Sequence, residues 1–184
     1  SGIFSRKDQK KEIAIGQTKT GRRKITINSA PAQIRELLLE SQTVLLSPEE
    51  EEITKGAPSV RRQFFDRLFS TISKEYLTTL IDYTKTLKQR NALLKTKNPE
   101  KQIELWDATL AQKAEKLWAL REFFLNNFST CLKTTSKDYS RGEILIRLIR
   151  EKTKLEKKEF ISALIESRKK DLITQTTNCG PHRD

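Results

Sequence analysis

Residues 73–96 read SKEYLTTLIDYTKTLKQRNALLKT, and their apolar positions recur three or four residues apart. The row consists of Leu77, Leu80, Leu87 and Leu94, with Thr84 and Asn91 between them. At 3.6 residues per turn this spacing places the whole row on one side of a helix. Ser73 is a suitable N-cap because its hydroxyl oxygen can accept a hydrogen bond from a free backbone N–H. The stretch therefore predicts an amphipathic helix of about 35 Å.

A second, longer helix is predicted to start at Asn98-Pro99-Glu100, where a cap, a proline and an acid follow one another. Its apolar stripe contains Ile103, Trp106, Leu110, Ala114, Leu117, Phe124 and Phe128. Arg121 interrupts this stripe, and Leu120 and Leu125 can cover the gap. A short link makes the two helices antiparallel neighbours, the second about 50 Å long. A coiled-coil-like arm and an ordinary helical bundle both fit this pattern.

The N-terminal residues have the pattern of strands. Residues 12–15 (EIAI) and 24–27 (KITI) alternate polar and apolar side chains, as half-buried strands do. The turn-rich sequence GQTKTG at 16–21 lies between them, so a β-hairpin is predicted.

The other segments complete an α+β pattern. We expect a short helix at 31–40, a buried strand at 43–46, a helix beginning at Pro58, a strand (or a helix) at 142–149, and a basic amphipathic helix at 155–175. The end of the chain is expected to form a loop at Gly180-Pro181.

The composition favours a polyanionic partner. The chain has 184 residues, 36 Lys and Arg against 24 Asp and Glu, and a net charge of +12. Such an excess suits nucleic acid or an anionic membrane surface. No apolar run approaches the ~20 residues that span a bilayer. Cys131, Cys179 and the single His182 lack the spacing of a zinc site or a disulfide framework, so a reducing cytoplasm is expected.

The nucleotide-binding motifs of ATPases are missing from this sequence. Gly16 and Gly21 have the glycine spacing of a Walker A loop, but Arg22 and Arg23 stand where that loop needs Lys and then Ser or Thr. No apolar strand ends in Asp-Glu, as a Walker B strand does, and no ABC signature occurs. Because the chain also contains no Met, we expect it to be a fragment or a processed form.

Several stretches resemble the RecF family of DNA repair and replication proteins. The segment from Ser47-Pro48-Glu49 through KGAPSxRRxFxD at 55–66 resembles that family's "SPED…KGSPSxRRxFLD". LKQRNALLK at 87–95 and LWDxxL at 105–110 match two of its helices, and Arg168-x-x-Asp171 and GPHRD at 180–184 resemble its "GPHRDD" region. The order and spacing agree over residues 43–184. Glu50 and Glu51 replace the usual Asp-Leu, and Ala57 replaces a common Ser.

The resemblance implies an ABC/SMC-like ATPase with a helical arm inserted into its head. Residues 1–57 would belong to the head lobe, 58–133 would form the arm, and 134–184 would return to the head before the ABC signature and Walker B. Family members bind ATP and Mg²⁺, dimerise around the nucleotides, bind DNA at single-strand/double-strand boundaries, and work with RecO and RecR. The chain alone would then bind no nucleotide and be inactive as an ATPase.

Candidate DNA contacts are basic side chains of the predicted arm. Lys85, Lys88 and Lys95 fall on one face of the first arm helix, and Arg61 and Arg62 begin the helix before it. Such a face can neutralise phosphates without reading bases, although a solvated surface or structural ion pairs explain the same pattern. The residues that carry the family motifs are Ser47, Pro48, Glu49, Lys88, Gln89, Arg90, Asn91, Gly180, Pro181, His182, Arg183 and Asp184. No catalytic residue or metal ligand is expected, and a non-enzymatic coiled-coil interaction module is the alternative function.

Overall fold

The computed structural model describes residues 2–6, 9–17, 19–34, 36–37, 52–96, 100–139 and 155–183. Five sequence-based expectations lie outside these residues. They concern the strand at 43–46, the acidic segment with Ser47, Pro48 and Glu49, the cap at Asn98-Pro99, the strand at 142–149, and Asp184.

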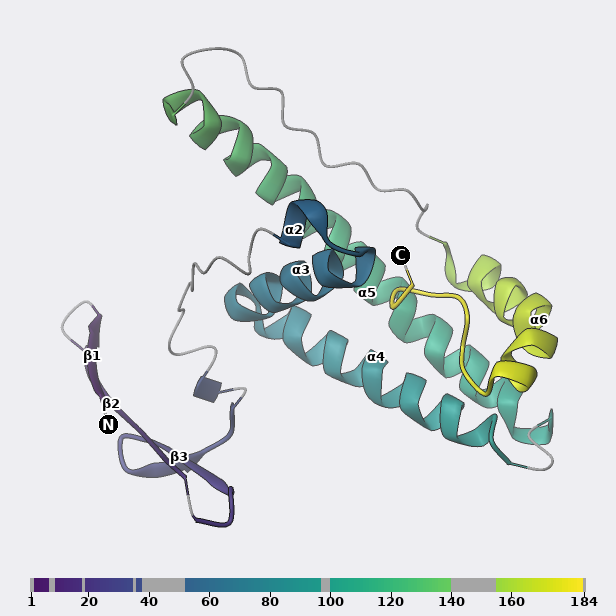
Figure 1. The fold of residues 1–184 in the computed structure, drawn as a ribbon, viewed down its shortest axis with the longest axis horizontal. Coiled ribbons are helices and arrows are strands. Elements are labelled where there is room, and N and C mark those ends of the chain that lie inside the picture. Colours follow the sequence, from purple (N-terminus) through teal and green to yellow (C-terminus); the bar gives the residue numbers. More distant parts are fainter. Residues whose placement is uncertain are drawn as a thin grey trace.

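The N-terminal residues form a four-stranded antiparallel sheet in the order β1-β2-β3-β4. Its strands are β1 (Gly2–Arg6), β2 (Gln9–Gln17), β3 (Arg23–Ile27) and β4 (Ala30–Ala32). The predicted hairpin is confirmed by β2 and β3, in which Ile13 pairs with Ile27 and Ile15 with Ile25. Gly21 in the turn has a φ of +82°, a left-handed conformation that glycine adopts without steric cost. Figure 1 shows the sheet to one side of the helices.

The helix expected to start at Pro31 starts later. Pro31 lies in β4, opposite Thr26 of β3. β4 is the last strand in the sheet order, where a residue without a backbone N–H is tolerated. Helical conformation begins at Ile34. The residue before it, Gln33, donates its backbone N–H to the Glu36 carboxylate at 2.7 Å. The prediction was wrong about Pro31 because a proline suits an edge strand as well as a first helical turn.

Five helices follow in the described residues: α2 (Glu52–Lys55), α3 (Pro58–Ile72), α4 (Lys74–Leu93), α5 (Glu100–Tyr139) and α6 (Lys157–Thr174). Ser73 caps α4 as predicted, since its hydroxyl oxygen accepts from the backbone N–H of Tyr76 at 3.1 Å. α5 continues beyond residue 133, where the arm was expected to end, because no Gly or Pro occurs between Cys131 and Tyr139. None of these helices is long and apolar enough to cross a membrane.

The core forms where α3, α4, α5 and α6 meet. Its buried members are Phe69, Tyr76, Tyr83, Leu110, Ala111, Ala114, Leu117, Trp118, Phe160 and Leu164. α4 and α5 lie side by side along most of α4, with α3 and α6 packed against them (Figure 1). Trp118 packs edge-on against Phe160 with ring centroids 5.0 Å apart, which confirms it as a core residue, and Trp106 is half-buried. Leu94 is buried and Leu87 is half-buried against the core.

Candidate functional site

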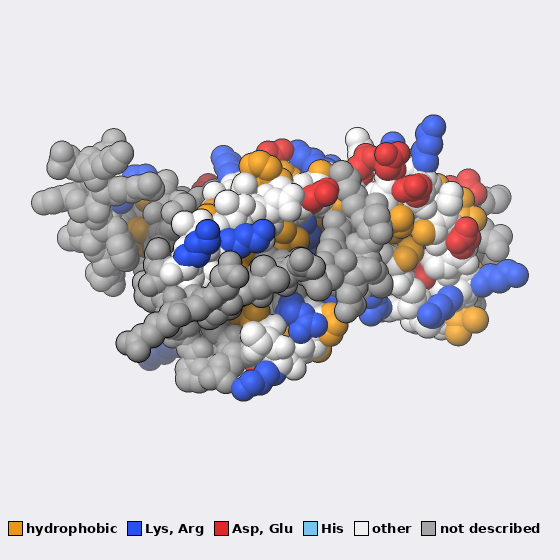
Figure 2. All heavy atoms as spheres, turned by 90° about the horizontal axis from the view of Figure 1, so that it is seen from above, with side chains coloured by type: hydrophobic (Ala, Val, Ile, Leu, Met, Phe, Trp, Pro, Cys, Tyr) orange, Lys and Arg blue, Asp and Glu red, His pale blue; other side chains and the backbone are white. Residues whose placement is uncertain are grey.

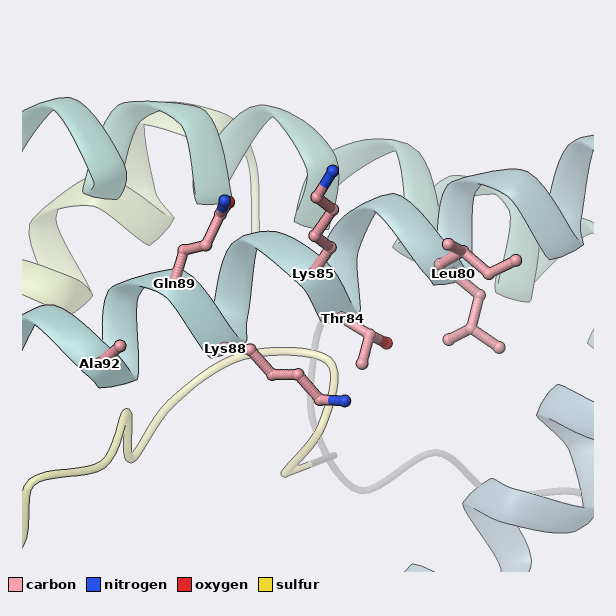
Figure 3. A pocket seen from close by; sticks show the side chains of 7 residues that line it. Leu80, Thr84, Lys85, Lys88, Gln89 and Ala92 are labelled. Carbon is pink, nitrogen blue, oxygen red and sulfur yellow. The ribbon is translucent and has the colours of Figure 1, made fainter. Parts of the chain in front are cut away.

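Of the three lysines predicted to contact phosphate, two lie on α4 and one lies just beyond its end. Lys85 and Lys88 are exposed on α4, but Lys95 follows the end of this helix in a turn. Lys85 and Lys88 line an open groove of about 600 Å³ together with Leu80, Ile81, Thr84, Gln89 and Ala92. Figure 3 shows the two ammonium groups pointing away from each other at this groove. The groove on α4 thus combines two exposed lysines with the apolar side chains of Leu80, Ile81 and Ala92.

The acidic residues of α4 are paired with lysines of α5. Asp82 pairs with Lys113 at 3.6 Å, and Glu75 pairs with Lys116 at 2.9 Å. Among the described residues, none of the three candidate lysines takes part in an ion pair. Figure 2 shows one face of the molecule, on which basic side chains are interspersed with acidic and hydrophobic ones. Among the side chains coloured on this face, the basic ones do not form one continuous patch.

The two candidate arginines lie in the first turns of α3. The Nη1 of Arg61 donates to the backbone oxygen of Gly56 at 2.8 Å. This hydrogen bond joins α3 to the end of the preceding α2. Arg62 is half-buried and also has an interaction partner within the structure. Arg61 therefore has a structural role that the sequence left open.

The family motifs meet in a buried polar junction around Arg90. The Nε of Arg90 donates to Oδ1 of Asp107 at 2.7 Å, and its Nη1 donates to Oδ2 of Asp171 and Oγ1 of Thr177, both at 2.8 Å. Arg168 donates to the other oxygen of Asp107 at 2.9 Å. The side chains of Arg90 and Asp171 are fully buried. Charges removed from water must be paired, and here two arginines face two carboxylates across α4, α5 and α6.

The segment 175–183 after α6, which we call the strap, is held by the same junction. The Asn91 side-chain oxygen accepts from the backbone N–H and the hydroxyl of Thr177, at 2.9 and 2.7 Å. Asp171 accepts from the backbone N–H and the side-chain amide of Asn178, both at 2.9 Å. The strap begins at Gln175, whose φ of +53° ends α6 in a left-handed conformation. Its first residues are therefore fixed to both α4 and α6.

His182 holds the other end of the strap to α4. Its Nδ1 lies 2.6 Å from the hydroxyl oxygen of Tyr83, and its Nε2 lies 3.0 Å from the backbone oxygen of Thr177. Because a carbonyl only accepts, Nε2 carries the hydrogen and the Tyr83 hydroxyl donates to Nδ1. Gly180, which lies between Thr177 and His182 in the sequence, has a φ of +119°. A Cβ at this position would lie 2.9 Å from the Phe160 ring and 3.0 Å from the Tyr83 hydroxyl oxygen. The strap thus needs glycine at this position.

A second polar cluster fixes the strap to α5. Arg121 pairs with Asp66 of α3 at 2.8 Å, and its Nη1 donates to the backbone oxygen of Pro181 at 2.5 Å. The Tyr76 hydroxyl also donates to Asp66. Burial raises the pKa of Tyr76 well above its ordinary value, and the Asp66 carboxylate raises it further against the opposing effect of Arg121. Burial alone would lower the pKa of Arg121, but Asp66 and Tyr76 raise it, so the guanidinium stays charged.

Both clusters hold parts of the structure together. The carboxylates of Asp107 and Asp171 in the junction, and of Asp66 in the second cluster, are each bonded to an arginine. No group of three or more His, Cys, Asp or Glu among the described residues could hold a metal ion. Burial raises the pKa of the Cys179 thiol, which disfavours the nucleophilic thiolate. Together, the junction and the second cluster link four helices and the strap.

Sequence reasoning singled out part of this junction. Arg90, Asn91, Asp107 and His182 belong to the motifs that carry the family resemblance, but their roles were left open. Tyr83 and Thr177 were missed, since a Tyr on an amphipathic helix and a Thr before a loop carry no specific signal. Arg121 was noted only as an interruption of an apolar stripe. Charged residues are rarely buried unless they are paired, so an arginine in an apolar stripe predicts an acidic partner, which here is Asp66.

The helix-rich α+β fold, with its small sheet and long antiparallel helix pair, is that of an ABC-type ATPase. The DNA replication and repair protein RecF of Clostridium perfringens (strain SM101 / Type A) is 34% identical over 180 residues, covering 95% of this chain and 50% of the relative. RecF of Leptospira interrogans serogroup Icterohaemorrhagiae serovar Lai (strain 56601) is 30% identical over 175 residues, which are 94% of this chain and 48% of that protein. No family profile matches the chain.

Two solved structures have the same fold. The recombination mediator protein RecF-ATPrS in the RecFOR pathway superposes with a TM-score of 0.83 at 29% identity, covering 98% of this chain and 52% of that one. The RecF-ATP structure superposes with a TM-score of 0.80 at 28% identity, covering 95% and 50%. The chain belongs to the RecF family. It spans about half the length of the relatives it matches.

Proposed function

We propose that this chain is part of a RecF-type, ATP-dependent DNA-binding protein of recombinational repair and replication restart. The observation that carries the proposal is the agreement in sequence and fold with RecF over 95% of the chain. The RecF structures that it superposes on are described as bound to ATP or an analogue, in a recombination pathway. The preferred DNA would be the boundary between single and double strands, and the protein would act in the cytoplasm with RecO and RecR.

ATP and Mg²⁺ would be bound by residues beyond this chain, because its sequence lacks Walker A, ABC signature and Walker B motifs. Residues 1–57 would supply part of the ATPase head, residues 58–133 the arm, and residues 134–184 the return toward the head. The intact protein would dimerise when ATP is bound. ATP hydrolysis would transfer the γ-phosphoryl group to water, with the charge of the transition state stabilised by Mg²⁺.

Lys85 and Lys88 would supply sequence-independent contacts to DNA phosphates. Both are exposed on α4, and the acids of the same helix are neutralised by lysines of α5. Residues 58–133 contain 14 basic and 8 acidic side chains, a net charge of +6 out of the total of +12. A Lys ammonium is a flexible point charge, which suits attraction to a backbone rather than recognition of a base edge.

The alternative is a non-enzymatic module that binds a protein partner through its helices. One observation favours it: the groove of Lys85 and Lys88 also contains Leu80 and Ile81, and Ile81 is 45% exposed. Leu105 and Phe123 on α5 are exposed as well. Apolar side chains on a helix surface are typical of protein interfaces rather than of phosphate contacts.

Fluorescence anisotropy with a labelled single-strand/double-strand junction, a duplex and a single strand tests the proposal. DNA binding that is tighter for the junction and weakens steeply as salt increases is the expected result. Binding that is absent at low salt, together with a helical surface that associates with protein, would favour the interaction module instead. Adding RecR or RecO to the DNA-bound chain then tests the partner assignment.

A further inference from the structure

The helix that carries the candidate DNA contacts also holds the strap. On α4, Tyr83, Arg90 and Asn91 bind strap residues, and Lys85 and Lys88 lie between them in the sequence. Tyr83 and Arg90 are buried, whereas the two lysines are exposed. One stretch of two to three helical turns therefore has a DNA-facing side and a strap-binding side.

We propose that DNA binding on α4 is coupled to docking of the strap, so that DNA stabilises the docked strap and the docked strap strengthens DNA binding. This inference rests on the proposed function, because it takes Lys85 and Lys88 as the DNA contacts.

The proposed coupling gives the strap a docked and an undocked state. In the docked state its contacts with α4 are short hydrogen bonds of buried and half-buried groups, which are either made or broken. In the undocked state Arg90 would lose the Thr177 hydroxyl, and Asp171 would lose both hydrogen bonds from Asn178. The proposal is that this loss changes how α4 presents its two lysines to phosphates.

The strap is attached to α5 and α6 by contacts that are separate from its contacts with α4. Asn178 is bonded to Asp171 of α6, and Pro181 is bonded to Arg121 of α5. Thr177 and His182 are the strap residues that bind α4 side chains. Removing only these α4 contacts should therefore weaken the link to the DNA-binding side while the strap stays attached to α5 and α6.

Amide hydrogen exchange measured by NMR on the whole chain tests the coupling. The backbone N–H groups of Thr177 and Asn178 are the reporters, since each is bonded to a side chain of the junction. Saturating duplex DNA should slow exchange of both amides by at least about fivefold, the lower end of the usual range of allosteric coupling. The exposed double variant Lys85→Glu/Lys88→Glu should lose this protection.

A strap variant supplies the reciprocal test, because coupling between two binding events has the same magnitude in both directions. Tyr83→Phe combined with Asn91→Ala should speed exchange at Thr177 without DNA and lower DNA affinity. The matched control is Thr86→Val, which removes a buried hydroxyl of α4 that bonds only to the Asp82 carbonyl of its own helix. This control should change neither quantity.

The outcomes separate the coupling from the proposed function. If the unmodified chain binds DNA but exchange at Thr177 and Asn178 is unchanged, the coupling is refuted and DNA binding stands. If the unmodified chain does not bind DNA at all, the proposed function is refuted and the coupling with it. Protection by DNA that survives Lys85→Glu/Lys88→Glu would also overturn the coupling through α4.

Discussion

Arg90 of α4 and Asp171 of α6 form an ion pair of 2.8 Å from which solvent is fully excluded. The two residues are 81 positions apart in the sequence. Asp107 of α5 binds the same guanidinium at 2.7 Å, so a single arginine joins three helices. Such a contact contributes little net energy relative to apolar packing, but removing one partner leaves buried charge without compensation.

Replacing Arg90 by Ala is therefore expected to lower the free energy of unfolding by about 3–5 kcal/mol. The reason is that Asp107 loses one of its two arginines and Asp171 loses its only one in the junction. Urea unfolding followed by circular dichroism measures the loss. Lys88→Ala, on the exposed side of the same helix, is the control and should stay within about 0.5 kcal/mol of the unmodified chain. Equal effects of both substitutions would show that the junction is solvated.

Gly180→Ala is expected to destabilise the strap. The added Cβ would approach the Phe160 ring at 2.9 Å, and the φ of +119° is strained for any residue with a Cβ. A cost of roughly 1–3 kcal/mol is typical of such backbone strain. Gly16→Ala in β2 is the matched control, because no atom lies within 4 Å of its added Cβ. Thermal unfolding of the two variants checks this, and a Gly180 variant as stable as the Gly16 variant would contradict the packing of the strap.

Alkaline pH is expected to destabilise the fold through Tyr76. Its pKa is raised in the folded state, chiefly by burial, whereas in the unfolded chain the phenol has its ordinary pKa of about 10. The contribution of this hydroxyl is therefore complete below pH about 10 and decreases as the pH rises above that value. Denaturant titrations between neutral pH and pH about 11 should show a steeper loss for the unmodified chain than for Tyr76→Phe. Parallel curves would mean that Tyr76 ionises equally in both states.

The chain alone is expected to release no phosphate from ATP and to bind ATP weakly. The three nucleotide-binding motifs do not occur in its sequence, and both carboxylates of the junction are bonded to Arg90. Steady-state phosphate release and equilibrium dialysis with Mg²⁺-ATP test this expectation. Turnover similar to that of a RecF protein of full length would require a nucleotide site that differs from the family motifs.

The regular elements were predictable from the sequence because local patterns determine them. The row from Leu77 to Leu94 and the cap at Ser73 predicted α4 to within a few residues, and alternation predicted the β2–β3 hairpin. Pro31 was assigned to the wrong element because proline fits two local contexts. Lys95 was expected on this helix, but α4 ends at Leu93 and Lys95 lies in the turn that follows.

The junction was not predictable from the residues alone. Arg90 lies on the same helix as Lys88 and has a similar charge, and nothing local shows that Arg90 is buried and Lys88 exposed. That difference depends on Asp107 and Asp171, which come from two other helices. Periodicity describes one element at a time, so pairings across 17 and 81 positions become visible only in the folded chain.

The salt dependence of DNA binding, measured for the unmodified chain and for Lys85→Glu/Lys88→Glu, tests the central claim most directly. Removing one lysine–phosphate interaction should reduce the slope of log K against log salt by roughly 0.9 on duplex DNA. The double variant should therefore bind several duplexes more weakly by a similar factor and with a flatter slope, because these interactions do not depend on sequence. Lys169→Glu/Lys170→Glu on α6 makes the same change in charge and is the control. If the α4 variant keeps both affinity and slope while the α6 variant loses them, DNA does not bind on α4 and the proposed interaction is wrong.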